Sequence, residues 1–172
     1  MLVSDSELTH WKDPMLNNEA FRRIRYALEL DDATTVEIFA AGLYNCDEET
    51  VKRFSRKDSD ETRVIFPDTE FVHFLNGLIV HRRGGKPAEV TKNETINNNK
   101  VLKKLRIAME MYEDEMLVVF DCGDIRLSRH KLSALFRTEG HKHFRECNDH
   151  TLRQFLKGLA IYCDRLRQTH NG

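Results

Sequence analysis

The sequence predicts an all-α protein made of two tandem repeats of about four short helices each, packed together. First, a single register with an offset of 81 residues pairs similar residues along most of the chain. Second, the 172 residues include only 8 Gly and 3 Pro, which leaves few turns and argues against an all-β sandwich. Third, the apolar residues recur at three- and four-residue steps, as they do on one face of a helix.

The repeat defines the predicted domain organisation. Asn17-Asn18 recurs as Asn98-Asn99, and the register then continues without a gap. Other pairs are Arg25 with Arg106, Phe39 with Phe120, Gly42 with Gly123, and Phe74-Leu75-Asn76-Gly77-Leu78 with Phe155-Leu156-Lys157-Gly158-Leu159. We expect an N-terminal extension (1–16), a first repeat (17–82), a polar linker (83–97) and a second repeat (98–167). Repeats of this size lie near the lower limit for independent stability, so the two cores should share an interface.

The first two helices of each repeat follow from apolar spacing and helix-end signals. Asn17 or Asn18 is the expected N-cap of the first helix. Its apolar face and the copy of that face comprise Ala20, Phe21, Ile24, Ala27 and Leu28, and Val101, Leu102, Leu105, Ala108 and Met109. The second helix should span about 33–41 and stop at Gly42, where glycine can adopt the left-handed conformation; Gly123 repeats that stop. Residues 116–120 alone resemble a buried strand, but their partner segment 35–39 favours a helix.

The last two helices are placed by their capping residues. Asp47 and Ser128 are the expected N-caps of the third helices, and Asp68 and Asp149 begin the fourth helices. Gly77 and Gly158 lie inside the fourth helices, where glycine costs about 1 kcal/mol relative to alanine. Close packing of another helix against these glycines explains them best. In the N-terminal extension, Leu8, Trp11 and Met15 would share one face of a helical turn.

Composition limits the class of protein. Lys and Arg total 27 and Asp and Glu total 28, so no overall field steers the chain onto nucleic acid or anionic lipid. The 4 Cys are far apart and form no C-x-x-C pair, and the first residues lack a signal-peptide pattern. We therefore expect a reduced, cytoplasmic protein. The longest apolar run, 116–120, is far shorter than the roughly 20 residues of a membrane span.

Several phrases of the sequence resemble a known family. These are the Asn-Asn helix openings, Ser133-Ala134-Leu135-Phe136-Arg137, Gly140-His141-Lys142-His143-Phe144-Arg145-Glu146-Cys147, and the doubled Phe-Leu-x-Gly-Leu. They are similar to the YehS-like family of short cytosolic bacterial proteins, which contain two copies of a domain of unknown function. The resemblance covers about residues 17–163 and implies an all-helical duplicated fold. It implies no activity, so no catalytic residue is transferred from it.

One candidate site is a cluster of metal-binding residue types in the second repeat. His141, His143, Cys147 and His150 offer imidazole and thiolate ligands suited to zinc. Their spacing, H-x-H-x3-C-x2-H, matches no zinc-finger pattern. The alternatives are two histidines packed in a connecting loop beside a buried Cys147, or a cysteine-dependent enzyme with His143 or His150 as base. Apart from this zinc hypothesis, no cofactor is predicted.

A second candidate site is basic. Residues 128–147 contain five basic and two acidic residues, whereas the equivalent residues 47–66 contain five basic and six acidic ones. An anion or nucleic acid should therefore bind to the second repeat, through Arg129, Lys131, Lys142 and Arg145. The helices flanking Gly42 and Gly123 resemble a helix-turn-helix, although the turn is longer than in that motif.

These features favour a non-catalytic binding or regulatory module. No Gly-rich phosphate loop, nucleophile elbow or H-E-x-x-H motif is present. The expected partner is a macromolecule, with a protein favoured over nucleic acid and no membrane. The alternatives are a helix-turn-helix-like nucleic-acid-binding protein that uses the basic second repeat, and a metal-binding or cysteine-dependent enzyme at the His/Cys cluster.

Overall fold

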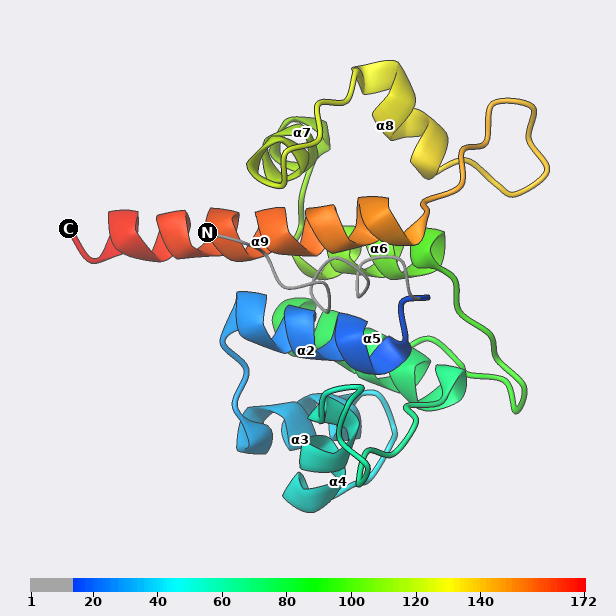
Figure 1. Ribbon diagram of the computed structural model, residues 1–172, viewed down its shortest axis with the longest axis vertical. Coiled ribbons are helices and arrows are strands. Elements are labelled where there is room, and N and C mark those ends of the chain that lie inside the picture. The colour runs from blue at the N-terminus through cyan, green and yellow to red at the C-terminus, as the bar shows by residue number, and fades with distance from the viewer. Residues whose placement is uncertain (1–13) are drawn as a thin grey trace.

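The computed structural model describes residues 14–172, which form helices and no strand (Figure 1). Helices α2 to α5 form the first unit and α6 to α9 the second. Their bounds are α2 (Asn17–Leu28), α3 (Asp32–Ala41), α4 (Glu48–Ser55), α5 (Asp68–Arg83), α6 (Asn98–Ala108), α7 (Glu113–Cys122), α8 (Arg129–Leu135) and α9 (Asp149–His170). The all-helical, duplicated architecture is confirmed. The predicted amphipathic turn with Leu8 and Trp11 lies outside the described residues.

The predicted capping role of Asn17 or Asn18 is wrong. The N-cap of α2 is Leu16, which makes no side-chain capping bond, and Asn17 is the first helical residue. The Asn17 amide instead donates to the Phe66 carbonyl at 3.0 Å and to the Asp68 carboxylate at 2.7 Å. Since its side chain ties α2 to the start of α5, it is not available to the first turn of its own helix.

The second asparagine of each pair holds the non-helical segment before the last helix of its unit. Asn18 is fully buried and donates to the carbonyls of Phe54 and Val64, while its oxygen accepts from the Phe66 amide. The second unit repeats all three bonds, between Asn99 and the backbone of Leu135, Arg145 and Cys147. The repeated asparagines are therefore tertiary clamps, which explains their recurrence better than helix capping does.

The remaining helix starts follow the predicted signals. Helix α3 begins at Asp32, one residue earlier than expected, because Asp31 caps it by accepting from the Thr34 amide. Asp47 and Ser128 are the N-caps of α4 and α8, as predicted. The apolar run 116–120 lies inside α7, so the helical interpretation is confirmed.

The reason predicted for Gly42 and Gly123 is wrong, although α3 and α7 do end at them. Their φ angles are −89° and −92°, and the left-handed residues are their neighbours, Leu43 at 66° and Asp124 at 63°. A Cβ on Gly42 would overlap the backbone carbonyl of His73 in α5. These glycines are needed for space, because two helix backbones meet there.

The predicted reason for Gly77 and Gly158 is confirmed. A Cβ on Gly77 would fall on the Ile38 carbonyl, well inside the 3.0 Å that real Cβ atoms keep. Gly158 is placed in the same way against the Val119 carbonyl of α7. Each unit therefore has two helices in backbone contact, α3 against α5 and α7 against α9, through a pair of glycines.

Substitution of Leu43 tests the left-handed conformation that follows the end of α3. Its side chain is 73% exposed, and its positive φ is unfavourable for a residue with a Cβ by about 1 to 2 kcal/mol. We expect Leu43→Gly to raise the free energy of unfolding by about 0.5 to 1 kcal/mol, since the entropic cost of glycine offsets part of the relief. Urea unfolding measures the change. Leu43→Ala keeps the Cβ and should show no such gain; a gain equal to that of glycine would contradict the argument.

The two units pack by exchanging contacts between their first and last helices. Helix α2 lies along α9, and α6 lies along α5, so the first helix of each unit packs mainly on the last helix of the other (Figure 1). The Met15 amide donates to Asp149 at 3.0 Å, and the Ile96 amide donates to Asp68 at 3.2 Å. These two bonds are equivalent under the repeat offset. The buried apolar side chains of both units form one continuous core, which confirms the expected interface.

An ion pair is buried at this interface. The carboxylate of Glu19 on α2 accepts from Arg153 Nε on α9 at 2.8 Å, and the two side chains are only 5% and 9% exposed. Burial by itself raises the pKa of Glu19, but the hydrogen bonds and charges of Arg153 and Arg23 outweigh it and lower that pKa below its usual value. Glu19 is therefore held ionised where the two units meet.

Candidate functional site

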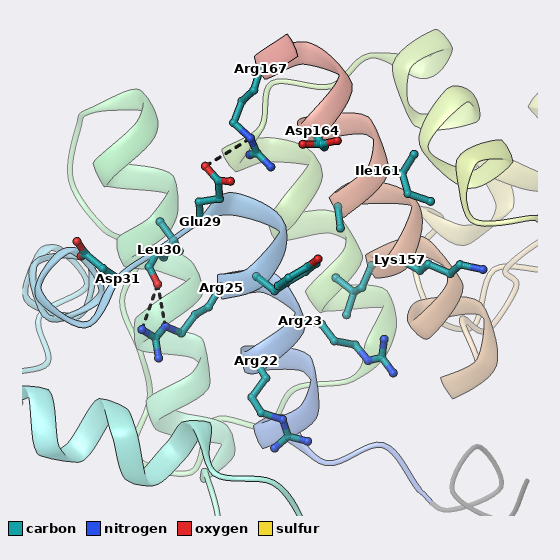
Figure 2. A pocket seen from close by; sticks show the side chains of 13 residues that line it. Arg22, Arg23, Arg25, Glu29, Leu30, Asp31, Lys157, Ile161, Asp164 and Arg167 are labelled. Atoms are coloured by element: carbon teal, nitrogen blue, oxygen red, sulfur yellow. Dashed lines mark hydrogen bonds and ion pairs between the residues drawn. The ribbon is translucent and has the colours of Figure 1, made fainter. Parts of the chain in front are cut away.

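A groove with a volume of about 970 Å³ lies between α2 and α9 (Figure 2). We call it the α2–α9 groove. Its apolar surface includes Tyr26, Leu30, Leu156, Ala160 and Ile161. Its charged surface consists of Arg22, Arg23, Arg25, Lys157 and Arg167, and of Glu29, Asp31 and Asp164. Apolar side chains and an excess of cations thus line one hollow.

The groove residues are held in place by contacts at its edges. Figure 2 shows Arg167 reaching across from α9 to Glu29, at 3.4 Å, and Arg25 turned back to the Leu30 carbonyl. Arg25 also pairs with Asp32 at 2.7 Å. Tyr26, by contrast, is 79% exposed. A tyrosine this exposed beside an apolar floor is typical of surfaces that contact other proteins.

The repeat pairs α6 with α5 as it pairs α2 with α9, and the linker contacts α5 beside this pair. Asn76 on α5 donates to the Ala88 carbonyl at 3.3 Å, and its own oxygen accepts from Lys104 of α6 at 2.5 Å. The backbone amide of Ile96 donates to the carboxylate of Asp68, at the N-terminus of α5. The non-helical residues 88–96 therefore lie along α5 between Asn76 and Asp68, and Asn76 is the position they share with the α2–α9 groove, where its counterpart is Lys157.

The corresponding positions of the α2–α9 groove carry other side chains. Lys157 replaces Asn76, and Arg23 replaces Lys104. Lys157 lies 3.1 Å from Asp124 and remains about half exposed, at 51%. The groove thus has two cations where the α5–α6 pair has one amide and one cation.

The structure separates the four predicted anion-binding residues into two kinds. Arg129 is taken up by two acidic side chains, Glu113 at 2.8 Å and Asp114 at 2.5 Å. Lys131, Lys142 and Arg145 are exposed, and within residues 14–172 none of them forms an ion pair. Arg129 therefore has least charge to offer a ligand.

The predicted metal ligands do not come together. The rings of His141 and His143 are 5.7 Å apart, and His143 also approaches His130 at 6.0 Å, but Cys147 is buried. In the described part of the chain, no group of three or more His, Cys, Asp or Glu side chains is placed to hold a metal ion. The exposed His150 does not complete such a group.

Cys147 is poorly suited to act as a nucleophile. Burial is the main cause that raises the pKa of its thiol, to about 12, and the nearby Asp149 adds to the effect. Its backbone amide donates to Asn99, and its sulfur lies 3.9 Å from the Asn148 carbonyl. The thiol is neutral at physiological pH, whereas nucleophilic attack requires the thiolate.

Sequence reasoning missed the α2–α9 groove entirely. The groove joins residues near position 26 to residues near position 160, and periodicity gives no information on which helices meet. One signal was available: the repeat pairs Asn76 with Lys157 inside a strongly matching phrase, so a charged residue replaces a buried amide there. The turns 42–47 and 123–128 are also longer than a helix-turn-helix allows, as the sequence already indicated.

The architecture is that of a duplicated helical protein in which two related units exchange helix contacts, and residues 14–172 leave a groove between α2 and α9. The family described as "Protein of unknown function (DUF1456)" matches residues 17–84 and 98–163, and the chain belongs to this family. It is 40% identical over 149 residues to "Uncharacterized protein YehS" of Escherichia coli (strain K12), which covers 85% of this chain and 95% of that protein. No solved structure matches the chain. Across residues 14–172, no helix has the length and apolar character needed to cross a membrane.

Proposed function

We propose that this protein is a non-catalytic binding module that takes a non-helical, acidic segment of another protein into the α2–α9 groove. The observation that carries the proposal is the contact of the linker with Asn76 of α5, whose counterpart in the α2–α9 groove is Lys157. There Asn76 and Lys104 hold a non-helical segment on the equivalent pair of helices, α5 and α6, and Lys157 and Arg23 stand at the same positions of the groove.

The charges and apolar residues of the groove support an acidic partner. Its cations outnumber the acidic side chains that line it, five to three, and each of the five also has an acidic partner, so an incoming carboxylate would compete with these ion pairs. At the place of Asn76, which donates to a peptide carbonyl, Lys157 offers a stronger donor that favours a carboxylate. Tyr26, Leu30 and Ile161 supply the apolar contact area on which most of the affinity of such interfaces depends.

A peptide titration tests the proposal. The probe is a fluorescein-labelled 12-residue peptide that alternates Glu with Leu or Val; its counterpart carries Lys in place of Glu. In fluorescence anisotropy at low salt, the acidic peptide should bind and the basic one should not. Ile161→Asp places a repelling charge on the half-exposed groove floor and should weaken binding at least about tenfold, or about 1.4 kcal/mol.

The matched control is Val118→Asp on α7. Val118 is 47% exposed and does not line the groove, so this variant adds the same charge without affecting the peptide. Equal affinity of wild type and Ile161→Asp would refute the proposal.

A second experiment repeats the peptide titration after removal of residues 1–13. If the peptide binds only after removal, the occupant of the groove is the N-terminus of the same chain, and the proposed partner is wrong.

A further inference from the structure

Three cationic positions are shared by the two units but differ in their counter-ions. Under the repeat offset, Arg22, Arg25 and Arg56 correspond to Lys103, Arg106 and Arg137. In the first unit each cation has an acidic partner. The distances are 3.6 Å from Arg22 to Asp58, 2.7 Å from Arg25 to Asp32 and 3.4 Å from Arg56 to Glu49.

The second unit lacks these pairings. Glu113 stands where the first unit has Asp32, but it is bound to Arg129. His130 replaces Glu49, which removes the carboxylate altogether. Glu139 replaces Asp58 but is exposed on the following loop and forms no ion pair with Lys103. As far as the structure describes the chain, Lys103, Arg106 and Arg137 are without an acidic partner.

These cations line two adjoining hollows. One has a volume of about 470 Å³ and is lined by Arg106, Arg137 and His141, by Ser133 and Thr138, and by Glu113, whose carboxylate is bound to Arg129. The other, of about 210 Å³, is lined by Lys100, Lys103 and again Arg137, and also by Glu139 and the amides of Asn97 and Asn99. Arg137 therefore stands between them. Arg106 is held with its guanidinium over the Phe136 ring, at 4.6 Å, which fixes its direction.

We infer that these two hollows bind successive phosphates of a nucleic-acid strand, independently of the α2–α9 groove. Arginine and lysine without counter-ions, next to hydroxyl donors, suit phosphate oxygens, and two adjoining hollows suit a repeating phosphodiester. The exposed Lys142 and Arg145 belong to the loop that supplies His141, so they extend the same basic surface. The site contacts the phosphate backbone and not the bases, since its cations outnumber its two carboxylates and the side chains of Asn97 and Asn99 are already bonded to the protein backbone.

A binding experiment with charge-matched variants tests the inference. The probe is a 5′-fluorescein 20-nucleotide U-rich RNA, titrated by anisotropy in 50 mM salt, with a 20-base-pair DNA duplex as a second arm. Lys103→Glu with Arg137→Glu should raise Kd at least about tenfold and reduce the salt slope by about 1.4, as two lost phosphate contacts require. Both side chains are exposed, so helix content by circular dichroism should not change.

The control is Lys52→Glu with Lys57→Glu in the first unit. Both lysines are exposed, and the variant carries the same change in net charge. The Kd of this control should stay within about twofold of the wild-type value. Its net charge changes as much as that of the test variant, but it removes none of the proposed phosphate contacts, so it loses only the long-range attraction. The milder pair Lys103→Gln with Arg137→Gln should lie between wild type and the Glu variant. Equal weakening by both Glu variants, no binding by wild type, or displacement of the RNA by polyglutamate at equal charge would each overturn the inference.

Discussion

Gly77→Ala and Gly158→Ala should each lower the free energy of unfolding by about 3 kcal/mol or more. The added Cβ would overlap a backbone carbonyl of the facing helix, Ile38 for Gly77 and Val119 for Gly158. Backbone cannot rotate aside as a flexible side chain does, so the helices must separate and the surrounding core must open. In a helix without such a neighbour the same change stabilises by about 1 kcal/mol. The sign of the change in unfolding free energy, measured by urea titration, therefore tests whether the two helix backbones are in contact at these glycines.

Ala160→Gly on α9 is the matched control for this pair. It lies one half-turn beyond Gly158 and is half-buried at the groove. This change removes a Cβ instead of adding one, and it should lower the free energy of unfolding by about 1 kcal/mol from helix propensity alone. Stabilisation of the protein by Gly77→Ala would show that α3 and α5 do not approach so closely, and the explanation of all four glycines would be withdrawn.

Glu19→Gln should lower the free energy of unfolding by about 3 kcal/mol at pH 7, because it removes one partner of a buried ion pair. The pKa of Glu19 is lowered in the folded protein, so its carboxylate contributes stability above the unfolded pKa, which is near 4.5. That contribution is lost as the pH falls below this value and through the folded pKa. The stabilities of wild type and variant should therefore converge at low pH. Urea titrations between pH 7 and pH 3 measure the convergence.

Two further variants support the interpretation of the Glu19 result. Glu37→Gln changes an exposed glutamate on α3 that forms no ion pair in the described part of the chain, so its effect should stay within about 0.5 kcal/mol at every pH. Glu19→Leu with Arg153→Met replaces both charges by apolar side chains and should be less destabilising than Glu19→Gln. A loss for Glu19→Gln that is constant with pH would mean that packing, and not charge, explains it.

Local physics explains why the sequence predicted most of the helices. Asp47 and Ser128 are recognisable as N-caps because capping depends on residues three positions apart. The run 116–120 is ambiguous by itself, but its repeat partner settled it as a helix. A repeat also predicts a shared interface, since each unit is too small to bury its own core.

The Asn pairs and the helix-end glycines were misinterpreted because their roles depend on distant partners. The Asn18 amide bonds residues 36 and 46 positions away, and no local rule distinguishes such an amide from a cap. A glycine at position 42 is compatible both with a left-handed helix end and with close packing of another helix. The position of the His73 carbonyl shows that glycine is required because it has no Cβ, and not because of a positive φ.

The basic charge of the second repeat could be predicted from its composition. Which of its basic side chains are paired with acidic ones in the fold could not. The sequence selected Arg129 along with Lys131, Lys142 and Arg145, whereas folding brings Glu113 and Asp114 to Arg129. Lys103, Arg106 and Arg137, in contrast, have no acidic partner among the residues that the structure describes. The sequence by itself determined the helices, the duplication and which unit is basic, because those depend on spacing and on residue counts. Only the tertiary structure decided which helices meet, where the α2–α9 groove lies and which cations lack an acidic partner among residues 14–172, because those depend on contacts between residues far apart in the chain.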